Sequence, residues 1–384
     1  MKTKKIKLPF KIKKPILALG SQTKNTVCFA KNNFAYLTEA HPDLNNPIDL
    51  VNFEKHADYF LKKHPKIIAY DLHPEYQSTK YAFNLSTNAY RLTPIQHHHA
   101  HIASCMVENG LKNEKVIGIA CDGTGLGSDN ALWGAEFLIC NYKDFIRKAH
   151  LAQVPLIGGE RSIFEPWRLS ATWLYRIYKE KMFRLDIEFI KRIDKNKWKV
   201  LQEADSKNIN SPQASSMGRL FDAAASLIFA KYNVSYEAEL AIELEKTALS
   251  YQLSPPKTDP PAAEAISYPF KISKKQDCYI LDPLPIFKKM VSELKRKEPK
   301  AKIAYQFHLT VAKMITEMSA ILRKDTGIKK VVLSGGVFQN NLLLTLALDL
   351  LYKEGFSVIV HKKLSCNDSC LSLGQAAIAN FIGK

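Results

Sequence analysis

The sequence has 384 residues, 46% hydrophobic and 24% charged, which is enough to bury a substantial core in two lobes. No run approaches the roughly 20 apolar residues of a membrane span, and the apolar stretch near the basic start is too short for a signal peptide. Seven cysteines without paired spacing indicate reduced thiols and a cytoplasmic protein rather than a disulfide framework.

The formal net charge of +18 raises the question of nucleic-acid binding. Apart from an N-terminal cluster, however, the lysines are scattered through ordinary predicted helices, and no RNA-binding motif with stacking aromatic residues is present. Non-specific association or an acidic partner explains the charge equally well. We therefore expect neither a nucleic-acid partner nor a membrane partner.

The first part of the chain alternates short strands and helices. Polar turns separate three opening strands. A helix with apolar periodicity follows, and the next strand ends in the carboxylate of Asp71. In order, the predicted elements are strands 15–20, 26–31 and 34–40, helix 48–64, strand 66–71, a short helix near 78–83 and strand 89–92.

Residues 93–109, TPIQHHHAHIASCMVEN, contain four of the eleven histidines and are predicted to form the next helix. Thr93 is a favourable N-cap, Pro94 suits the first helical position, and Gln96 completes a capping box with Thr93. Gly110 then provides a helix stop.

The side chains of this histidine helix divide between two faces. An apolar stripe passes through Ile95, Ile102 and Met106, with His99 on the same side. His97 and His101, four residues apart, lie nearly opposite, where two imidazoles can converge on one cation. Two interpretations stay open: a metal site that needs carboxylates from elsewhere, or a solvated polar face rich in histidine.

The strand and helix pattern then restarts, so the sequence predicts a duplicated, two-lobed α/β architecture of the actin-like ATPase class. The expected lobes are residues 1–112, with the C-terminal helix 368–384 packing back on it, and residues 113–367 with helical insertions. The elements expected in this part are strands 115–121, 132–140 and 145–153, a Gly-rich hairpin loop at 122–130, helices starting near 165, 218, 237, 285 and 301, a proline-rich surface insertion at 253–266, strand 330–333, helix 338–352, strand 356–361 and helix 368–382.

Three turns in this part could carry chemistry. Asp122 ends a buried strand and opens the turn DGTG, where glycines expose N–H groups to a phosphate, although such turns are common. The loop 334–336, Ser-Gly-Gly, connects a strand to a helix and allows close approach of a nucleotide. Asp368 begins a helix, where an N-cap is the default interpretation. In an actin-like fold, Asp122 and Asp368 face the cleft, so two histidines and two aspartates would bind Zn²⁺ or Fe²⁺.

Taken together, the motifs resemble the C-terminal half of the hydrogenase maturation carbamoyltransferase HypF, from about residue 15 to the end. The same module is shared with the tRNA threonylcarbamoyl-adenosine enzyme TsaD and with antibiotic O-carbamoyltransferases. The motifs that carry the resemblance are QHHHAHIAS (96–104), DGTG (122–125), DNALWGAEF (129–137), VPLIGG (154–159), EPWR (165–168), SSMGRLFDA (215–223), SYEAELAIELE (235–245), LSGGVFQNNLL (333–343) and the ND and LGQA pair (367–376).

The resemblance implies specific roles for residues of this chain. Asp222 is expected to accept the ribose hydroxyls of a nucleotide, and Lys24 to act with Asp122 in catalysis by neutralising a phosphate or steadying a carbamoyl oxygen. The alternative for Asp222 and Glu243 is a solvated helix face. The implied metal ligands are His97, His101, Asp122 and Asp368, and the implied ATP or AMP contacts are Gly123, Thr124, Gly125, Gly218, Asp222, Glu243, Gly335, Gly336 and Asn340.

The chain departs from the family pattern at several positions. Larger side chains near the expected cleft could narrow it or alter nucleotide affinity, whereas the four proposed metal ligands are intact. Asn130, Ala135, Ala238, Ser369 and Cys370 replace glycines that are usual in the family, and Cys366 replaces a proline. The 384 residues leave no room for the acylphosphatase-like, zinc-finger and YrdC-like parts that precede this module in a full-length HypF.

The implied reaction is transfer of a carbamoyl group from carbamoyl-AMP to the C-terminal cysteine thiolate of HypE. A separate YrdC-like or acylphosphatase-like chain would then supply the missing parts. Two alternatives remain open: a non-catalytic nucleotide-binding remnant or subunit of a split HypF, and a TsaD-like tRNA-modifying enzyme. The form of the histidine motif, QHHHAH, favours HypF.

Overall fold

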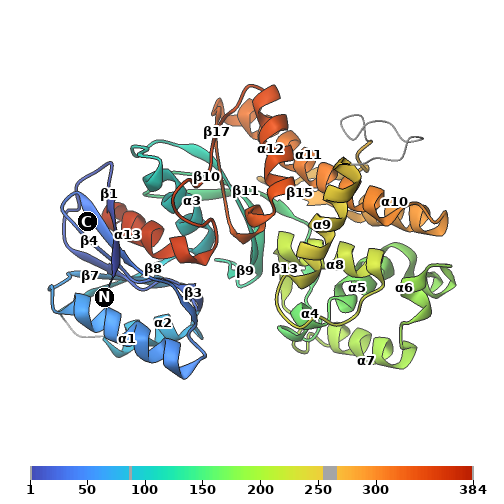
Figure 1. Ribbon diagram of the computed structural model, residues 1–384, viewed down its shortest axis with the longest axis horizontal. Helices are drawn as coiled ribbons and strands as arrows, with labels where there is room; N and C mark the ends of the chain where they lie inside the picture. Colours follow the sequence, from blue (N-terminus) through green and yellow to red (C-terminus); the bar gives the residue numbers. More distant parts are fainter. Residues whose placement is uncertain (1, 86–88, 254–265, 383–384) are drawn as a thin grey trace. The chain divides into compact units, whose positions relative to one another are not determined.

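A computed structural model describes residues 2–85, 89–253 and 266–382 (Figure 1). Contacts divide the chain into two compact units. Unit 1 comprises residues 1–148, 322–339 and 355–384, and unit 2 comprises residues 149–321 and 340–354. The predicted lobe boundary, between residues 112 and 113, is based on the point where the order of strands and helices repeats. The two units are defined by contacts instead, so this boundary stays a prediction. Among the described residues, no helix is long and apolar enough to cross a membrane.

The first sheet of unit 1 has six strands, with antiparallel pairing from β1 to β2 and parallel pairing from β2 to the edge strand β8. Successive residues of a strand point to opposite faces. Ile16 and Ala18 therefore enter one apolar cluster, while Leu17 and Leu19 enter another. The strands, in the order in which they pair, are β1 (Thr3–Lys7), β5 (Phe34–Thr38), β4 (Cys28–Lys31), β2 (Ile16–Ala18), β7 (Ile67–Asp71) and β8 (Arg91–Ile95).

Helices cover both faces of this sheet. On one face, α1 (Pro47–Leu61) and α2 (Gln77–Asn84) pack through residues such as Phe53 and Ala82. On the other face lie α3 (His97–Glu108) and α13 (Leu371–Ile382), so the last helix of the chain packs beside its first strands (Figure 1).

A second layer of strands in unit 1 covers the far side of α3. Strand β9 (Val116–Leu126) pairs with β10 (Leu132–Cys140) on one side and with β16 (Lys330–Ser334) on the other, and β17 (Ser357–Ile359) pairs with β16. Residues of β9, β10, α3 and α13 belong to one apolar cluster. Helix α3 is thus enclosed between two sheets and a neighbouring helix, which explains why eleven of its residues are buried.

The contact between α3 and α13 depends on a glycine. A Cβ placed on Gly374 of α13 would lie 1.9 Å from the carbonyl oxygen of Ala100 in α3. Because that oxygen belongs to the main chain, it cannot move without displacing the helix. Glycine at this position therefore sets how closely the two helices approach.

Unit 2 is mainly helical and has short strand pairs of its own. Strand β11 (Phe145–Leu151) enters it from unit 1 and pairs through its end with β15 (Cys278–Asp282). Strand β14 (Lys271–Lys275) pairs with β15, and β12 (Val154–Pro155) pairs with β13 (Gln213–Ser216). Its helices are α4 (Arg161–Phe164), α5 (Trp167–Tyr178), η1 (Lys179–Arg184), α6 (Glu188–Lys191), α7 (Lys195–Ser206), α8 (Met217–Phe229), α9 (Glu239–Leu253), α10 (Leu284–Lys295), α11 (Lys300–Thr326) and α12 (Asn341–Lys353).

Two predicted boundaries near the functional turns are wrong. The histidine helix begins at His97 rather than after Thr93, because residues 93–95 extend β8 and pair with β7. The DGTG segment is not a loop, since β9 continues to Leu126 and the reversal follows it.

Other differences are smaller. Seven strands escaped prediction: β1, β3 (Thr23–Asn25), β6 (His41–Asp43), β12, β13, β14 and β15, of which β3 and β6 pair with each other. A 3₁₀ turn, η3 (Gly336–Gln339), delays the start of α12. The predicted insertion 253–266 falls almost wholly outside the described residues. None of the seven cysteines is in a disulfide.

Candidate metal centre

The two histidines of the predicted metal site project from the first turns of α3. Gln96 is the N-cap, and its side chain accepts a hydrogen bond from the N–H of His99. Both His97 and His101 are fully buried, with their ring centroids 5.1 Å apart. The alternative of a solvated histidine-rich face is therefore wrong.

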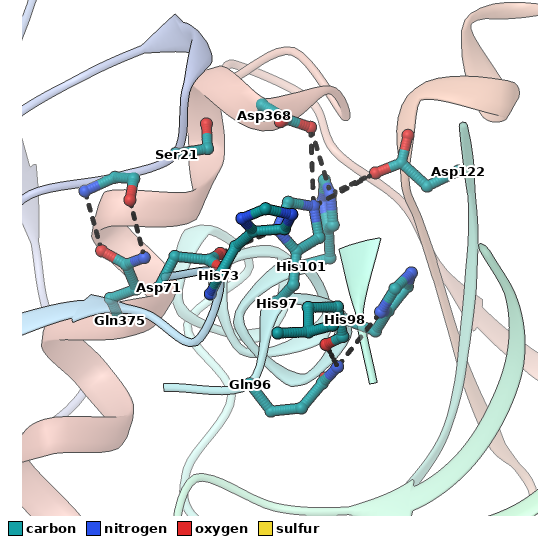
Figure 2. A network of polar contacts seen from close by, with 12 residues as sticks. Ser21, Asp71, His73, Gln96, His97, His98, His101, Asp122, Asp368 and Gln375 are labelled. Carbon is teal, nitrogen blue, oxygen red and sulfur yellow. Dashed lines mark hydrogen bonds and ion pairs between the residues drawn. The ribbon is translucent and has the colours of Figure 1, made fainter. Parts of the chain in front are cut away.

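The two carboxylates reach the histidines from different segments of unit 1. Asp122 lies in β9, and Asp368 opens the short 3₁₀ turn η4 (Asp368–Cys370), which leads into α13. The default N-cap interpretation of Asp368 is wrong, because Asn367 caps this turn by accepting a hydrogen bond from the N–H of Ser369. The Asp368 carboxylate is consequently directed to the histidines (Figure 2).

The spacing of the four side chains fits a tetrahedral metal site. Ligand atoms about 2.0–2.2 Å from a tetrahedral zinc ion lie about 3.3–3.6 Å from one another. Here Nε2 of His97 is 3.4 Å from Asp122 Oδ2 and 3.8 Å from Asp368 Oδ1. Nε2 of His101 is 2.9 Å and 3.6 Å from the same two oxygens. One ligand atom from each residue lies within 4.8 Å of every other.

One buried atom supports a cation more directly than the spacing does. Nε2 of His97 has no hydrogen-bond partner among the described residues, although it faces two carboxylates. Its other ring nitrogen, Nδ1, is 2.8 Å from Oδ2 of the buried Asp71. A carboxylate on the far nitrogen fixes the ring orientation and tautomer in histidine–metal sites. The donor set therefore fits Zn²⁺ or Fe²⁺.

Electrostatics in the cluster favour ion pairs when no cation is present. Burial alone would lower the pKa of His97, but Asp71, Asp368 and Asp122 outweigh it and raise that pKa to about 10. Burial likewise opposes ionisation of Asp122, yet the hydrogen bond from His101 and the positive charge of His97 hold its pKa well below the usual range. A metal ion must displace these protons, so its binding weakens as pH falls.

The other two histidines of the motif have different environments. Burial lowers the pKa of His99 to about 4, and its Nε2 is bonded to the carbonyl oxygen of Asn141. Burial and the neighbouring His97 lower the pKa of His98 well below the ordinary value. Both imidazoles are therefore neutral, and His99 serves packing rather than metal binding.

The glycines of the two predicted phosphate loops lie against the cluster. Gly335 has a φ of +106°, and a Cβ there would be 2.2 Å from the carbonyl oxygen of Cys121, so only glycine fits. The N–H groups of Gly123 and Gly336 both donate to Asp122 Oδ1, at 2.8 and 3.1 Å. The N–H of Gly335 donates to the main-chain carbonyl oxygen of Cys366. A phosphate would have to share these donors, and their nucleotide role stays a prediction.

Nearby contacts tie the turn that carries Asp368 to the first strands. Gln375 of α13 forms two hydrogen bonds with the main chain of Gly20, at 2.8 and 3.1 Å (Figure 2). Thr26 Oγ1 donates to the carbonyl oxygen of Ser369 at 2.9 Å. Strand β3, which carries the exposed Lys24, contacts η4 itself. Lys24 thus belongs to the surroundings of the cluster, while its catalytic role stays a prediction.

The remaining predicted nucleotide residues lie in unit 2. Asp222 of α8 is buried, not solvated, and its Oδ2 is 3.2 Å from Arg219 Nη2 but accepts no hydrogen bond among the described residues. Burial raises the pKa of Asp222 to about 6. The Nε and Nη1 atoms of the buried Arg219 are also without hydrogen-bond partners there. Two adjacent buried groups with spare hydrogen-bonding capacity could take a polar ligand.

Three other predicted residues of unit 2 have ordinary structural partners. Glu243 is half-exposed and pairs with Lys231 at 3.3 Å. Asn340 caps α12 and contacts His308 Nε2 at 2.9 Å. Gly218 lies in the first turn of α8. None of these contacts tests a role in nucleotide binding.

A family model described as the second subdomain of the Kae1-like domain of carbamoyltransferases matches residues 118–375. A model of the HypF Kae1-like domain matches residues 11–108. The chain belongs to the HypF carbamoyltransferase family. The family assignment from sequence motifs is thus confirmed.

Relatives in the HypF family cover nearly all of the chain. Carbamoyltransferase HypF of Synechocystis sp. is 34% identical over 96% of this chain and 48% of the relative. A HypF homolog of Cupriavidus necator is 31% identical over 95% of this chain and 91% of the relative. The chain therefore spans about half the length of the first relative and nearly all of the second.

Two solved HypF structures share the fold. A full-length HypF in a phosphate- and nucleotide-bound form superposes with a TM-score of 0.89 at 37% identity, covering 99% of this chain and 57% of that one. HypF of T. kodakarensis gives a TM-score of 0.84 at 28% identity, covering 98% of this chain and 48% of that one. The predicted α/β fold of the actin-like ATPase class is confirmed.

Two groups beside the predicted residues went unrecognised in the sequence. Asp71, which orients His97, carried a usable signal, because a buried strand that ends in a carboxylate presents it at the sheet edge. Arg219 carried none, since an arginine three residues before Asp222 on a helix is an ordinary surface pair until burial is known.

Proposed function

We propose that this chain transfers a carbamoyl group from carbamoyl-AMP to the C-terminal cysteine thiolate of HypE. The thiolate attacks the carbamoyl carbon and forms a C–S bond. The bond between that carbon and the phosphate oxygen breaks, and AMP leaves with the electron pair. The observation that carries the proposal is the unpartnered, buried Nε2 of His97 facing two carboxylates in a chain of the HypF family.

Residues of the cluster have distinct parts in this proposal. His97, His101, Asp122 and Asp368 would hold the metal ion, which supplies Lewis acidity toward a carbamoyl or phosphate oxygen when bound. Lys24, the exposed residue of strand β3 beside η4, would neutralise charge on the leaving phosphate. The nucleophile comes from the partner, so the chain's own cysteines are not assigned this role.

The donor and its nucleotide come from outside the cluster. Carbamoyl-AMP would be made by a YrdC-like chain or domain, with an acylphosphatase-like part supplying carbamate. The nucleotide-bound state of the solved HypF supports binding of ATP or AMP by this chain. Seven free thiols, five of them buried, are consistent with a cytoplasmic setting.

The transfer assay supplies synthetic carbamoyl-AMP and HypE to the metal-loaded chain. Mass spectrometry of the C-terminal HypE peptide should show one added carbamoyl group on cysteine. HypE with that cysteine changed to serine controls for carbamoylation elsewhere, and carbamoyl phosphate with ATP should give product only when a YrdC-like partner is added.

Different failures of this assay have different meanings. No transfer from carbamoyl-AMP, with metal present, would favour a nucleotide-binding subunit without turnover. Carbamoylation of tRNA instead of HypE would favour the TsaD-like alternative. Product from carbamoyl phosphate and ATP without any partner would contradict the external supply of the donor.

Asp222→Ala should weaken binding of ATP or AMP in isothermal calorimetry. A lost charge-assisted hydrogen bond predicts a loss of about 1–3 kcal/mol. Since a carboxylate accepts hydroxyl donors best when ionised and the pKa of Asp222 is raised to about 6, wild-type affinity should fall as pH is lowered from 7 to 5.

Asp205→Ala is the matched control, since Asp205 is a half-buried carboxylate of the same unit. An Asp222 variant that binds nucleotide as tightly as the wild type, or an equal loss in the control, would remove Asp222 from the nucleotide site.

A further inference from the structure

Four side chains of unit 1 form a line of contacts that leaves the candidate metal cluster on its buried side. Nδ1 of His101 is 3.4 Å from Ser334 Oγ, and Ser334 Oγ is 2.9 Å from His361 Nε2. Nδ1 of His361 is in turn 2.7 Å from Glu108 Oε2. This line begins at the ring nitrogen of His101 that faces away from the carboxylates of Asp122 and Asp368.

The line is anchored at both ends by one helix. His101 and Glu108 are seven residues apart on α3, which places them on the same face two turns from each other. Ser334 ends β16, and His361 follows β17. Ser334 and His361, at the ends of these strands, therefore connect His101 to Glu108. The pairing of β16 with β17 holds Ser334 and His361 close to each other.

Glu108 is a fixed terminus for the line. Its Oε1 accepts hydrogen bonds from the N–H groups of Lys362, at 2.9 Å, of Leu364, at 3.0 Å, and of Lys363. The hydrogen bonds from His361 and from these amides hold the pKa of Glu108 at about 2, although burial opposes this. Glu108 thus stays an acceptor and obliges Nδ1 of His361 to carry a proton.

The direction of every other hydrogen bond follows when a metal takes Nε2 of His101 and His361 is a neutral imidazole. The proton of this imidazole must then be on Nδ1, which donates to Ser334 Oγ. The hydroxyl of Ser334 is left to donate to His361 Nε2, and His361 Nδ1–H donates to Glu108. Ser334 and His361 then each donate once and accept once, His101 donates and Glu108 accepts, so a single proton order satisfies all four buried groups.

A serine, histidine and glutamate in this sequence of contacts also resemble a nucleophilic triad. Ser334 is completely buried, however, and its Oγ faces the ring of His101 rather than space for a substrate. Cys370 Sγ is 3.6 Å from the same Nδ1, and although burial opposes it, His361 and His101 lower the pKa of this thiol to about 6, so its sulfur is a second acceptor for His101. The hydroxyl of Ser334 also contacts His361 Nε2 and so links His101 to that imidazole.

We propose that Ser334, His361 and Glu108 are positioning residues that fix the orientation and tautomer of His101 and present its Nε2 to a divalent cation. Asp71 does the same for His97 through a single carboxylate. The two histidines of one His-x-x-x-His pair are thus supported differently, one directly and one through a relay. This inference rests on the metal centre of the proposed function but not on carbamoyl transfer.

Zinc affinity tests the relay without HypE or nucleotide. Metal-free protein is titrated with Zn²⁺ against a chromophoric chelator. Loss of an outer partner of a metal ligand costs about 10–100-fold in affinity, which is the expected loss for Ser334→Ala and for His361→Phe. Ser334→Thr keeps the hydroxyl and should restore affinity. His99→Phe removes a buried imidazole from the same helix outside the relay and should leave affinity unchanged.

A spectroscopic measurement separates positioning from general loosening of the fold. Nitrogen-15 chemical shifts of His101 in the zinc-loaded wild type should show a protonated Nδ1, and Ser334→Ala should broaden or shift that signal alone. Wild-type zinc affinity in Ser334→Ala and His361→Phe overturns the proposal. So does an equal loss in His99→Phe, a loss confined to Cys370→Ala, an unprotonated Nδ1 in the zinc-loaded wild type, or a wild type that binds no zinc.

Discussion

Replacing both His97 and His101 with alanine should abolish metal binding while the chain remains folded. Elemental analysis of wild-type protein should find about one Zn or Fe per chain, since the four donors describe one tetrahedral site. The double variant keeps only Asp122 and Asp368, and two carboxylates alone do not hold a borderline-soft ion. Its metal content should therefore fall to background, and carbamoyl transfer should fall with it.

The control for this experiment is His99→Ala combined with His308→Ala. These residues are also fully or almost fully buried imidazoles with main-chain hydrogen bonds, but they lie outside the cluster. Circular dichroism establishes that both double variants are folded. Metal content that is unchanged in His97→Ala, His101→Ala would eliminate the site, and equal loss in the control would assign the effect to destabilisation.

Gly374→Val should strongly destabilise unit 1. Its Cβ would meet the Ala100 carbonyl oxygen at 1.9 Å, so α3 and α13 would have to separate. Overpacking of a core costs about 1–3 kcal/mol and occasionally more, and a clash with main chain belongs at the upper end. We expect the free energy of unfolding to fall by roughly 3 kcal/mol, measured by denaturant titration.

The same change should also weaken metal binding, because α13 continues directly from the turn that carries Asp368. Gly355→Ala provides the comparison. Gly355 has a φ of +77° and nothing within 4 Å of an added Cβ, so its replacement introduces backbone strain without a clash. If Gly374→Val costs no more than Gly355→Ala, the close approach of the two helices is not what stabilises unit 1.

The local sequence pattern was sufficient to predict the strands and helices in which apolar residues recur with a clear period. It failed where sheet pairing overrides local preference. Thr93 and Pro94 favour a helix start, yet residues 93–95 extend β8 because β7 offers a parallel partner along them. The lysine-rich β1 has no apolar alternation to reveal it and exists because β5 has an edge to pair with.

The four residues of the candidate site could be predicted from the sequence, but their burial and their further contacts could not. A spacing of four on a helix placed His97 and His101 together, and family motifs added Asp122 and Asp368. Burial was not foreseeable, because a histidine counts as polar in any periodicity, whereas α3 is enclosed on both sides. The relay could not be anticipated either, since Ser334 and His361 are distant in sequence from Glu108 and join it only through folded strands.

The ligand turn η4 and helix α13 are made after the other three ligands, and this has a consequence for biosynthesis. At about 5–20 residues per second, a ribosome needs roughly 10–50 s to proceed from Asp122 to Asp368. Throughout that interval three of the four ligands exist without the fourth, and the surface of α3 that α13 will cover is exposed. A complete metal site therefore forms only after Asp368 and helix α13 have been translated, so the metal ion is bound well after the other three ligands have been made.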